Sequence, residues 1–325
     1  MNGTGTVSAP QERVERDEPA VIADFIAFLK EASTRRHPTG RIPRFNQGRD
    51  SGCVEAEFTV LPDLPGELRV GLFAVPRAYR AWIRFANASS QSDRDKDIRG
   101  MSVRVYDVPG VNLTAGATTQ DFVLNSHPVM VASDTRSFLE LLQAMEGGGF
   151  QRALYFARHP RSARIGFAAR SNPSSHLDIP YWSTTPFLYG PERAVKYITR
   201  PCAPASAQPP KPLTDGYLRE ALRTRLATAE ACFDFMVQFQ SDDQRMPIED
   251  ATVEWKESDS PYRAVARIRI PPQRVDDPAR LRACEDTGFN PWHALVEHRP
   301  LGSMNRARRE IYRAMADLRQ SRQSA

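Results

Sequence analysis

The stretch "WIRFANASSQSDRDKDIRGMSVRVYDVPG", residues 82–110, decides the fold of this chain. It contains two runs rich in β-branched and aromatic residues, separated by a polar segment rich in Asp and Ser, as expected of two strands joined by a turn. Three runs of the same texture lie nearby: "CVEAEFTVL" (53–61), "LRVGLFAV" (68–75) and "TQDFVLNS" (119–126). Because Pro, Gly, Asp and Asn separate the runs at intervals of roughly ten residues, we predict an antiparallel meander or barrel.

Two segments beside these strands have the periodicity of helices. Residues 20–36, "AVIADFIAFLKEASTRR", and residues 135–145, "TRSFLELLQAM", repeat apolar residues at the spacing of an amphipathic helix. Asp134 or Thr135 is placed to cap the second helix, since both residue types accept hydrogen bonds from a helix N-terminus.

The second half of the chain mixes helix and strand. Residues 213–240 change from a helical to a strand pattern near Cys232, and residues 253–273 are predicted to form a hairpin around "SDSP". Strand blocks therefore lie on both sides of a helical middle, which favours one α+β unit over two domains. We expect residues 1–18 to be a mobile arm and residues 19–325 to form a single domain.

The composition is that of a soluble globular protein. Hydrophobic residues make up 41% of the 325 residues and charged residues 26%, and the chain is long enough to bury a substantial core. The net charge of +5, from 44 basic and 39 acidic side chains, is too small an excess to indicate a nucleic-acid partner. No apolar stretch approaches the roughly 20 residues of a membrane span.

The cysteines and the N-terminus bear on the compartment. Cys53, Cys202, Cys232 and Cys284 form no C-x-x-C pair, and we interpret them as unpaired thiols in a reducing environment. Residues 1–18 are polar and contain no apolar signal core, so secretion is not expected. The sequence thus predicts a cytoplasmic protein.

The segment "RARREIYRAMADLR", residues 306–319, is predicted to be the last helix. At 100° per residue, Arg308, Tyr312 and Arg319 fall on one line, because they stand four and seven residues apart. That line borders an apolar stripe formed by Ile311, Met315 and Leu318. In a solvated basic tail, a tyrosine would not be expected to align with two arginines beside a buried apolar stripe.

The remaining arginines of this helix lie away from the stripe, and we expect them to be solvated. This outward set consists of Arg306, Arg309 and Arg313, together with Glu310 and Asp317. Since only three arginines face outward and acidic residues accompany them, nucleic-acid binding through this helix is not favoured.

Tyr312 allows two interpretations. It either anchors the helix while the two arginines extend from the helix edge, or it is an anionic ligand supported by an adjacent arginine. A phenolate is stable at neutral pH only if something lowers a pKa near 10, and a guanidinium group or a metal cation would do so.

Four segments in order resemble the catalases. The R-x-x-x-Y pattern of Arg308 and Tyr312 resembles their proximal haem motif, and residues 82–110 resemble their RFS…DPRGFAVKFY strand pair. "TQDFVLNSHPVM" with "SDTRSF" looks like the segment bearing a distal asparagine and a haem-contacting phenylalanine, and residues 300–319 are similar to short catalase-related haem proteins. The resemblance, from about residue 40 to 320, implies a catalase-like antiparallel β-barrel with flanking helices and a C-terminal haem-ligand helix.

The resemblance also implies a cofactor and its ligands. Tyr312 would be the axial ligand of a ferric haem b, as a tyrosinate, and Arg308 would hydrogen-bond the phenolate oxygen. Three further arginines would pair with the haem propionates, since guanidinium groups suit a dicarboxylate: Arg44, Arg84 and Arg319.

Three uncharged residues complete the implied site. Asn125 would be the distal asparagine and Phe138 the aromatic that packs against the haem. Ala86 shares a strand face with Arg84, so its small side chain would leave room for the porphyrin. From pattern alone, Asn125 could equally be a turn residue, and Phe138 a residue of a helix core.

The chain departs from the family at the distal histidine. In the aligned stretch "RFNQGRDSGC", residues 44–53, Gln47 stands in the place of this histidine, or Asn46 if the register shifts by one. Cleaving the peroxide O–O bond requires a proton to move between its oxygens, which a histidine can mediate and a non-titrating amide cannot. His127, two residues after Asn125, either supplies the missing base or has a structural role.

The expected function follows from these residues. We predict a haem-dependent oxidoreductase that uses hydrogen peroxide or an organic hydroperoxide to oxidise a small organic substrate, with weak true catalase activity. One alternative is a hydroperoxide isomerase or dehydratase of the allene oxide synthase type, which a long apolar channel would favour. Another is a non-catalytic haem or small-ligand binding protein. The resemblance also implies a homo-oligomer, a dimer or tetramer.

Overall fold

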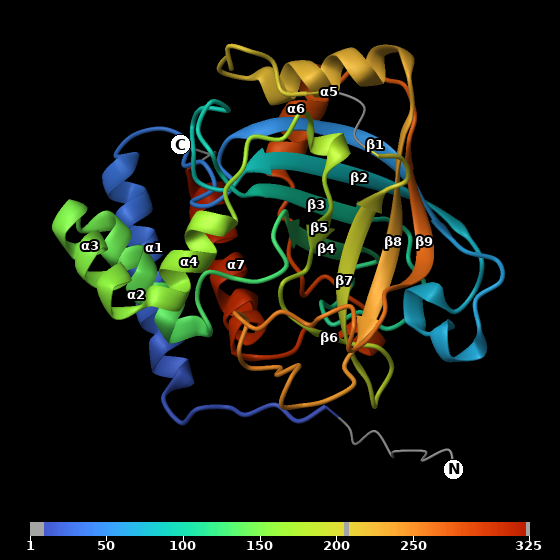
Figure 1. Cartoon of the computed structure of the whole chain (residues 1–325), viewed down its shortest axis with the longest axis horizontal. Helices are drawn as coiled ribbons and strands as arrows, with labels where there is room; N and C mark the ends of the chain where they lie inside the picture. Colours follow the sequence, from blue (N-terminus) through green and yellow to red (C-terminus); the bar gives the residue numbers. More distant parts are fainter. Residues whose placement is uncertain (1–9, 205–207, 323–325) are drawn as a thin grey trace.

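Eight antiparallel strands close on themselves to form a barrel (Figure 1). The computed structural model describes residues 10–204 and 208–322. In order around the barrel, the strands are β5 (Tyr181–Trp182), β4 (Gln120–Asn125), β3 (Arg99–Val105), β2 (Ala78–Asn87), β1 (Asp50–Val60), β9 (Arg263–Ile270), β8 (Ala231–Phe239) and β7 (Ala194–Pro201). Pairing of β5 with β7 closes the ring, and the short β6 (Phe187–Leu188) extends β7. The predicted α+β class with an antiparallel barrel is confirmed.

Helices flank this barrel. The helices are α1 (Glu18–Arg36), α2 (Thr135–Glu146), α3 (Gly149–Arg158), α4 (Pro160–Ala168), α5 (Tyr217–Thr228), α6 (Pro278–Asp286) and α7 (Ser303–Ser321). In Figure 1, α1 to α4 gather on one side of the barrel, α7 lies between them and the strands, and α5 and α6 lie over one end. The change from helix to strand near Cys232 is confirmed by α5 and β8.

The alternation of β2 and β3 separates the barrel core from the site. Ile83 and Phe85 point inward and are fully buried with Met101 in the main apolar cluster. Because successive side chains point to opposite faces, Arg84 and its strand neighbour Ser102 lie on the outer face. The outer face of the barrel therefore presents polar groups toward α7.

The last helix packs as its apolar stripe predicts. Ile311 and Met315 pack against a cluster that includes Phe25 and Leu29 of α1 and Leu139 of α2. The α2 helix begins at the predicted cap, where an Asp134 carboxylate oxygen accepts the backbone N–H of Ser137 at 2.9 Å. The three helices thus form one apolar layer beside the barrel.

Two predicted strands are wrong. Residues 68–75 form no strand; two short 3-10 turns, Gly66–Leu68 and Gly71–Phe73, occur here. Gly71 interrupts an extended run, since its φ of 51° is in the left-handed region. Of the hairpin predicted around "SDSP", only β9 forms. The segment before it turns instead, since Trp255 is buried in a separate cluster with Met246 and Leu301.

The prediction of four unpaired thiols is also wrong. Cys53 on β1 is bonded to Cys284 on α6, and Cys202 is bonded to Cys232 on β8. These partners are 231 and 30 residues apart in sequence, so their spacing alone does not reveal the pairing. The cysteines therefore give no argument for a reducing compartment.

Within residues 10–204 and 208–322, no helix combines the length and the apolar character that crossing a membrane requires.

Removing the Cys53–Cys284 bond should lower the free energy of unfolding by about 2–4 kcal/mol, because it closes a long loop in the unfolded chain. We expect Cys53→Ser with Cys284→Ser to unfold at lower urea concentration than the matched control, Cys202→Ser with Cys232→Ser, which opens a much shorter loop. Thiol titration of the denatured, unreduced wild type should find no free thiol. Four titratable thiols would contradict both bonds.

Candidate functional site

A cavity of about 690 Å³ lies between the outer face of the barrel and α7. Nearly all the residues singled out in the sequence line it: Arg44, Gln47, Arg84, Asn125, Phe138, Arg308, Tyr312 and Arg319, with Asn46 and His127. They come from segments far apart in the chain, which only the closed barrel and the packed α7 bring together. Ala86 is the exception, because it is fully buried between Asp50 and Gly100 and does not line the cavity.

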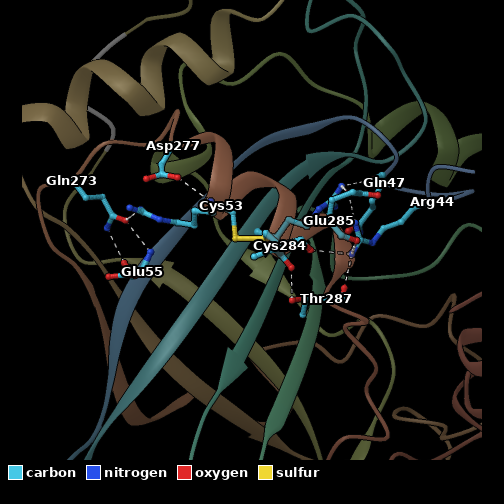
Figure 2. The surroundings of a disulfide bond; sticks show 12 residues. Arg44, Gln47, Cys53, Glu55, Gln273, Asp277, Cys284, Glu285 and Thr287 are labelled. Atoms are coloured by element: carbon cyan, nitrogen blue, oxygen red, sulfur yellow. Dashed lines mark hydrogen bonds and ion pairs between the residues drawn. A yellow bond between two sulfur atoms is a disulfide. The ribbon is translucent and has the colours of Figure 1, made fainter. Parts of the chain in front are cut away.

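Three guanidinium groups at one end of the cavity meet a single carboxylate, that of Glu285 on α6. Arg44 hydrogen-bonds this carboxylate, and Nη2 atoms of Arg84 and Arg319 lie 3.6 and 3.4 Å from it. Arg44 also donates to the Thr287 carbonyl oxygen at 2.6 Å. Figure 2 shows Arg44 directed at Glu285 and Thr287. We call Arg44, Arg84 and Arg319 the arginine cluster.

The arginine cluster is short of negative charge. Burial, the neighbouring Arg84 and, less strongly, Arg319 lower the pKa of Arg44 to about 9, despite the opposing effect of Glu285. The Nε groups of Arg84 and Arg319 are buried and have no hydrogen-bond partner among the residues that the structure describes. Buried donors and unneutralised cations are costly, so this end of the cavity suits an additional anion, such as a second or third carboxylate.

The fold fixes Glu285 at this position through α6. The Asp277 carboxylate accepts the backbone N–H groups of Ala279 and Arg280, which begins the helix. At the other end, the Cys53–Cys284 bond holds α6 to β1 (Figure 2). Sequence reasoning missed Glu285, since no local pattern links α6 to the cavity.

Gln47 is held tightly beside Asn125. Its backbone is in the left-handed region, with φ of 55°, where its N–H donates to the Ala88 carbonyl oxygen at 2.8 Å and its carbonyl oxygen accepts from Arg84 at 2.7 Å. Its side-chain Nε2 donates to Asn125 Oδ1 at 3.3 Å. A Cβ at Gly100 would lie 2.4 Å from Gln47 Nε2, so a larger residue on β3 would push this side-chain amide out of its present position. The two amides thus face the cavity together.

On the α7 side, Arg308 is buried, and no carboxylate within residues 10–204 and 208–322 pairs with it. Its Nη1 donates to Thr185 Oγ1 and Asn305 Oδ1, both at 3.1 Å, and not to the Tyr312 hydroxyl that the resemblance implies. Tyr312 is half-buried in the cavity wall one helical turn away. A buried guanidinium with only neutral partners favours an anion nearby.

Arg306 is not solvated, contrary to the sequence prediction. Its guanidinium pairs with Glu12 at 2.8 Å, Glu18 at 2.7 Å and Glu249 at 3.0 Å. Glu12 and Glu249 also accept backbone N–H groups at the start of α7, from Gly302 and Ser303. This network caps α7 and ties part of the predicted N-terminal arm to it; residues 1–9 of that arm lie outside the described residues.

The histidines divide into one in the cavity and others with structural contacts. His127 lines the cavity and is half-buried; burial lowers its pKa, against the opposing charge of Glu254. His298 is buried and accepts the Leu72 backbone N–H, while His293 contacts the Asp121 carboxylate at 2.9 Å.

Comparison with known proteins establishes the fold. No family model matches the chain, and no curated protein sequence matches it. Solved structures do: a bacterial catalase (15% identity, TM-score 0.69), a fungal catalase (14%, 0.71) and catalase A from Saccharomyces cerevisiae (14%, 0.68). Each match covers 98% of this chain, which spans 64%, 66% and 68% of the respective catalases. The chain therefore has a catalase-like fold over about two thirds of their length.

Glu285→Gln should lower the free energy of unfolding by about 1–3 kcal/mol, because it leaves three buried guanidinium groups without their shared carboxylate. Added succinate should recover part of this loss by binding the arginine cluster. Urea unfolding with and without succinate measures both effects. The matched control is Asp286→Asn, which removes the neighbouring, more exposed carboxylate paired with Arg41 and should cost less. Equal stability of the two variants, without a succinate effect, would contradict the charge deficit.

Proposed function

We propose that this chain binds haem b in the cavity and uses hydrogen peroxide or an organic hydroperoxide to oxidise a small organic substrate. The observation that supports this most directly is that two groups of polar side chains, one from α7 and one from the barrel, line the same cavity. Tyr312 and Arg308 come from α7, whereas Gln47 and Asn125 come from the barrel side, and the arginine cluster closes one end.

The residues present fit the cofactor. The arginine cluster, with its unpartnered buried Nε groups, suits the two propionates of haem. Apolar side chains suit the macrocycle, and those of the cavity wall include Val123, Phe138, Leu142 and Met315. Tyr312, beside the uncompensated charge of Arg308, is the proposed iron ligand as a tyrosinate. When bound, haem supplies the redox chemistry of a ferric iron.

The side chains on the barrel side set what this site does with a peroxide. The amides of Gln47 and Asn125 donate and accept hydrogen bonds, so they orient a peroxide in the cavity. Neither amide titrates, so neither moves a proton between the peroxide oxygens as a histidine would. We therefore propose weak disproportionation of hydrogen peroxide. His127, which lines the same cavity, is the candidate for any remaining base.

A second candidate function is rearrangement or dehydration of an organic hydroperoxide, of the allene oxide synthase type. The specific observation in its favour is the apolar extension of the cavity past α2 toward α3 and α4, along Leu141, Met145 and Phe156. Such a reaction needs no external reductant. Consumption of a fatty-acid hydroperoxide without an electron donor would favour it over the first proposal. If the protein binds haem but turns over no substrate, the remaining alternative is a non-catalytic haem or small-ligand binding protein.

We further propose that the chain forms a homo-oligomer, a dimer or tetramer, in line with the family it resembles. Sedimentation velocity of the purified protein tests this directly.

Tyr312→Phe should change the absorption spectrum of the purified protein, because the phenolate oxygen that would bind iron is removed. We expect a shifted Soret band or loss of haem. The matched control is Tyr106→Phe, since Tyr106 follows the end of β3, packs against Trp82 and Arg80, and does not line the cavity, so the spectrum should be unchanged. A colourless wild type, or a Tyr312→Phe spectrum identical to that of the wild type, would overturn the ligand assignment.

Gln47→His should raise oxygen evolution from hydrogen peroxide by about tenfold or more, because a histidine adds the acid–base group that the amide lacks. An oxygen electrode measures this rate. Asn46→His is the matched control, since Asn46 lines the same cavity one residue away. A rise in the Asn46 variant alone would move the distal position to residue 46, and vigorous oxygen evolution by the wild type would contradict the proposed role of Gln47.

A further inference from the structure

The α3–α4 segment, residues 149–170, lies in an unusually basic stretch. No acidic residue occurs between Glu146 and Asp178. The segment contains five arginines: Arg152, Arg158, Arg161, Arg164 and Arg170. Arg161 pairs with Asp250, whereas the guanidinium groups of the other four make no ion pair or hydrogen bond within residues 10–204 and 208–322. Elsewhere on this protein most arginines are matched by carboxylates, so this segment has an uncompensated positive charge.

Two phenylalanines stand out on the same segment. Phe150 on α3 is 80% exposed and Phe167 on α4 is 86% exposed, while Tyr155 and Ile165 of the same helices are buried. Large exposed aromatic rings are unfavourable in water unless a partner covers them. Short helices that combine aromatic rings with several arginines, and have no acidic residues, are typical of segments that lie in a membrane interface.

The cavity opens at this segment. Arg152, Phe167 and Arg170 are exposed to solvent, and yet they line the cavity. Phe156 and Met145 lie along the same lining. In Figure 1, α3 is at the outer edge of the helical layer, on the side away from the barrel. A mouth framed by two arginines and an aromatic ring therefore leads inward along an apolar wall.

We propose that the α3–α4 segment docks on an anionic phospholipid surface, with Phe150 and Phe167 inserted at the interface and the unpaired arginines on lipid phosphates. Docking would turn the cavity mouth toward the lipid, so that an apolar hydroperoxide enters from the membrane without crossing water. The docking stands on the charge and exposure of the segment alone. The entry of a hydroperoxide rests on the function proposed above.

Charge and aromatic exposure together select this partner. An anionic lipid surface offers phosphates in a plane and an apolar layer just below them, which matches guanidinium groups and protruding rings on one segment. A second copy of the chain would bring its own uncompensated arginines to the contact, and like charges would oppose it.

Vesicle flotation tests the proposal with the full-length protein. We expect binding to vesicles of phosphatidylcholine mixed with phosphatidylglycerol, little binding to phosphatidylcholine alone, and weaker binding as salt rises. Phe150→Ser with Phe167→Ser should reduce binding at least tenfold. Arg158→Gln with Arg164→Gln should reduce both binding and its dependence on salt.

Matched controls come from exposed residues elsewhere. Val75→Ser with Val111→Ser removes side chains that are 64% and 68% exposed, and Arg309→Gln with Arg313→Gln removes two exposed charges of α7. Both controls should bind as the wild type does. Absence of binding to anionic vesicles, or equal loss in the controls, would overturn the proposal. So would a Phe150/Phe167 variant that binds vesicles normally and differs only in oligomeric state, because the rings would then cover a protein contact.

A haem-independent readout separates this proposal from the function. Tyr312→Phe should float with anionic vesicles as the wild type does, because Tyr312 is not part of the α3–α4 segment. If vesicle binding holds while the spectrum of Tyr312→Phe is unchanged, the ligand assignment fails and the docking stands. If the spectrum changes and no vesicles bind, the docking alone fails.

Discussion

Three guanidinium groups share one carboxylate where the barrel, α6 and α7 come together, and the rest of the site depends on this arrangement. Arg84 is supplied by β2, Arg44 by the segment before β1 and Arg319 by the end of α7, while Glu285 is supplied by α6. One carboxylate faces three neighbouring cations, and burial, together with the positive charge of Arg84, lowers the pKa of Arg44 despite the charge of Glu285. Incompletely neutralised cations raise the free energy of the folded protein at this end of the cavity. For the same reason, this end favours an anionic ligand.

The outer face of the barrel lines the site, whereas the interior of the barrel is filled by the main apolar core. Since side chains alternate along β2 to β4, the apolar interior and the polar cavity wall are encoded in the same strands. Gly100 shows how closely the two faces are adjusted, because any larger residue there would displace Gln47. Opposite this wall, Arg306 and the glutamates around it fix the start of α7. The position of Tyr312 therefore depends on contacts made well away from the cavity.

The cavity joins three kinds of surface that differ in chemistry. The arginine cluster favours carboxylates, the amides of Gln47 and Asn125 favour a small polar ligand, and the apolar extension favours a hydrocarbon chain. The basic, aromatic α3–α4 segment lies where that extension reaches solvent. The arginine cluster and the α3–α4 segment share one property, an excess of positive charge. At each of them, a ligand or a surface is proposed to supply the negative charge.

The sequence by itself determined the class of fold and the inner face of the last helix. Periodicities of two and 3.6 depend on neighbours in the chain, so β1 to β4, β8 and β9 were predicted, as was the line of Arg308, Tyr312 and Arg319 that faces the cavity. The strands β5 and β7 were not predicted. Tertiary structure alone decided the pairing of Cys53 with Cys284 and the place of Glu285. Those depend on α6 folding back onto β1 over a separation of 231 residues, and no local pattern records such a contact. For the same reason Arg306 was wrongly assigned to solvent, since its glutamate partners lie far away in the sequence.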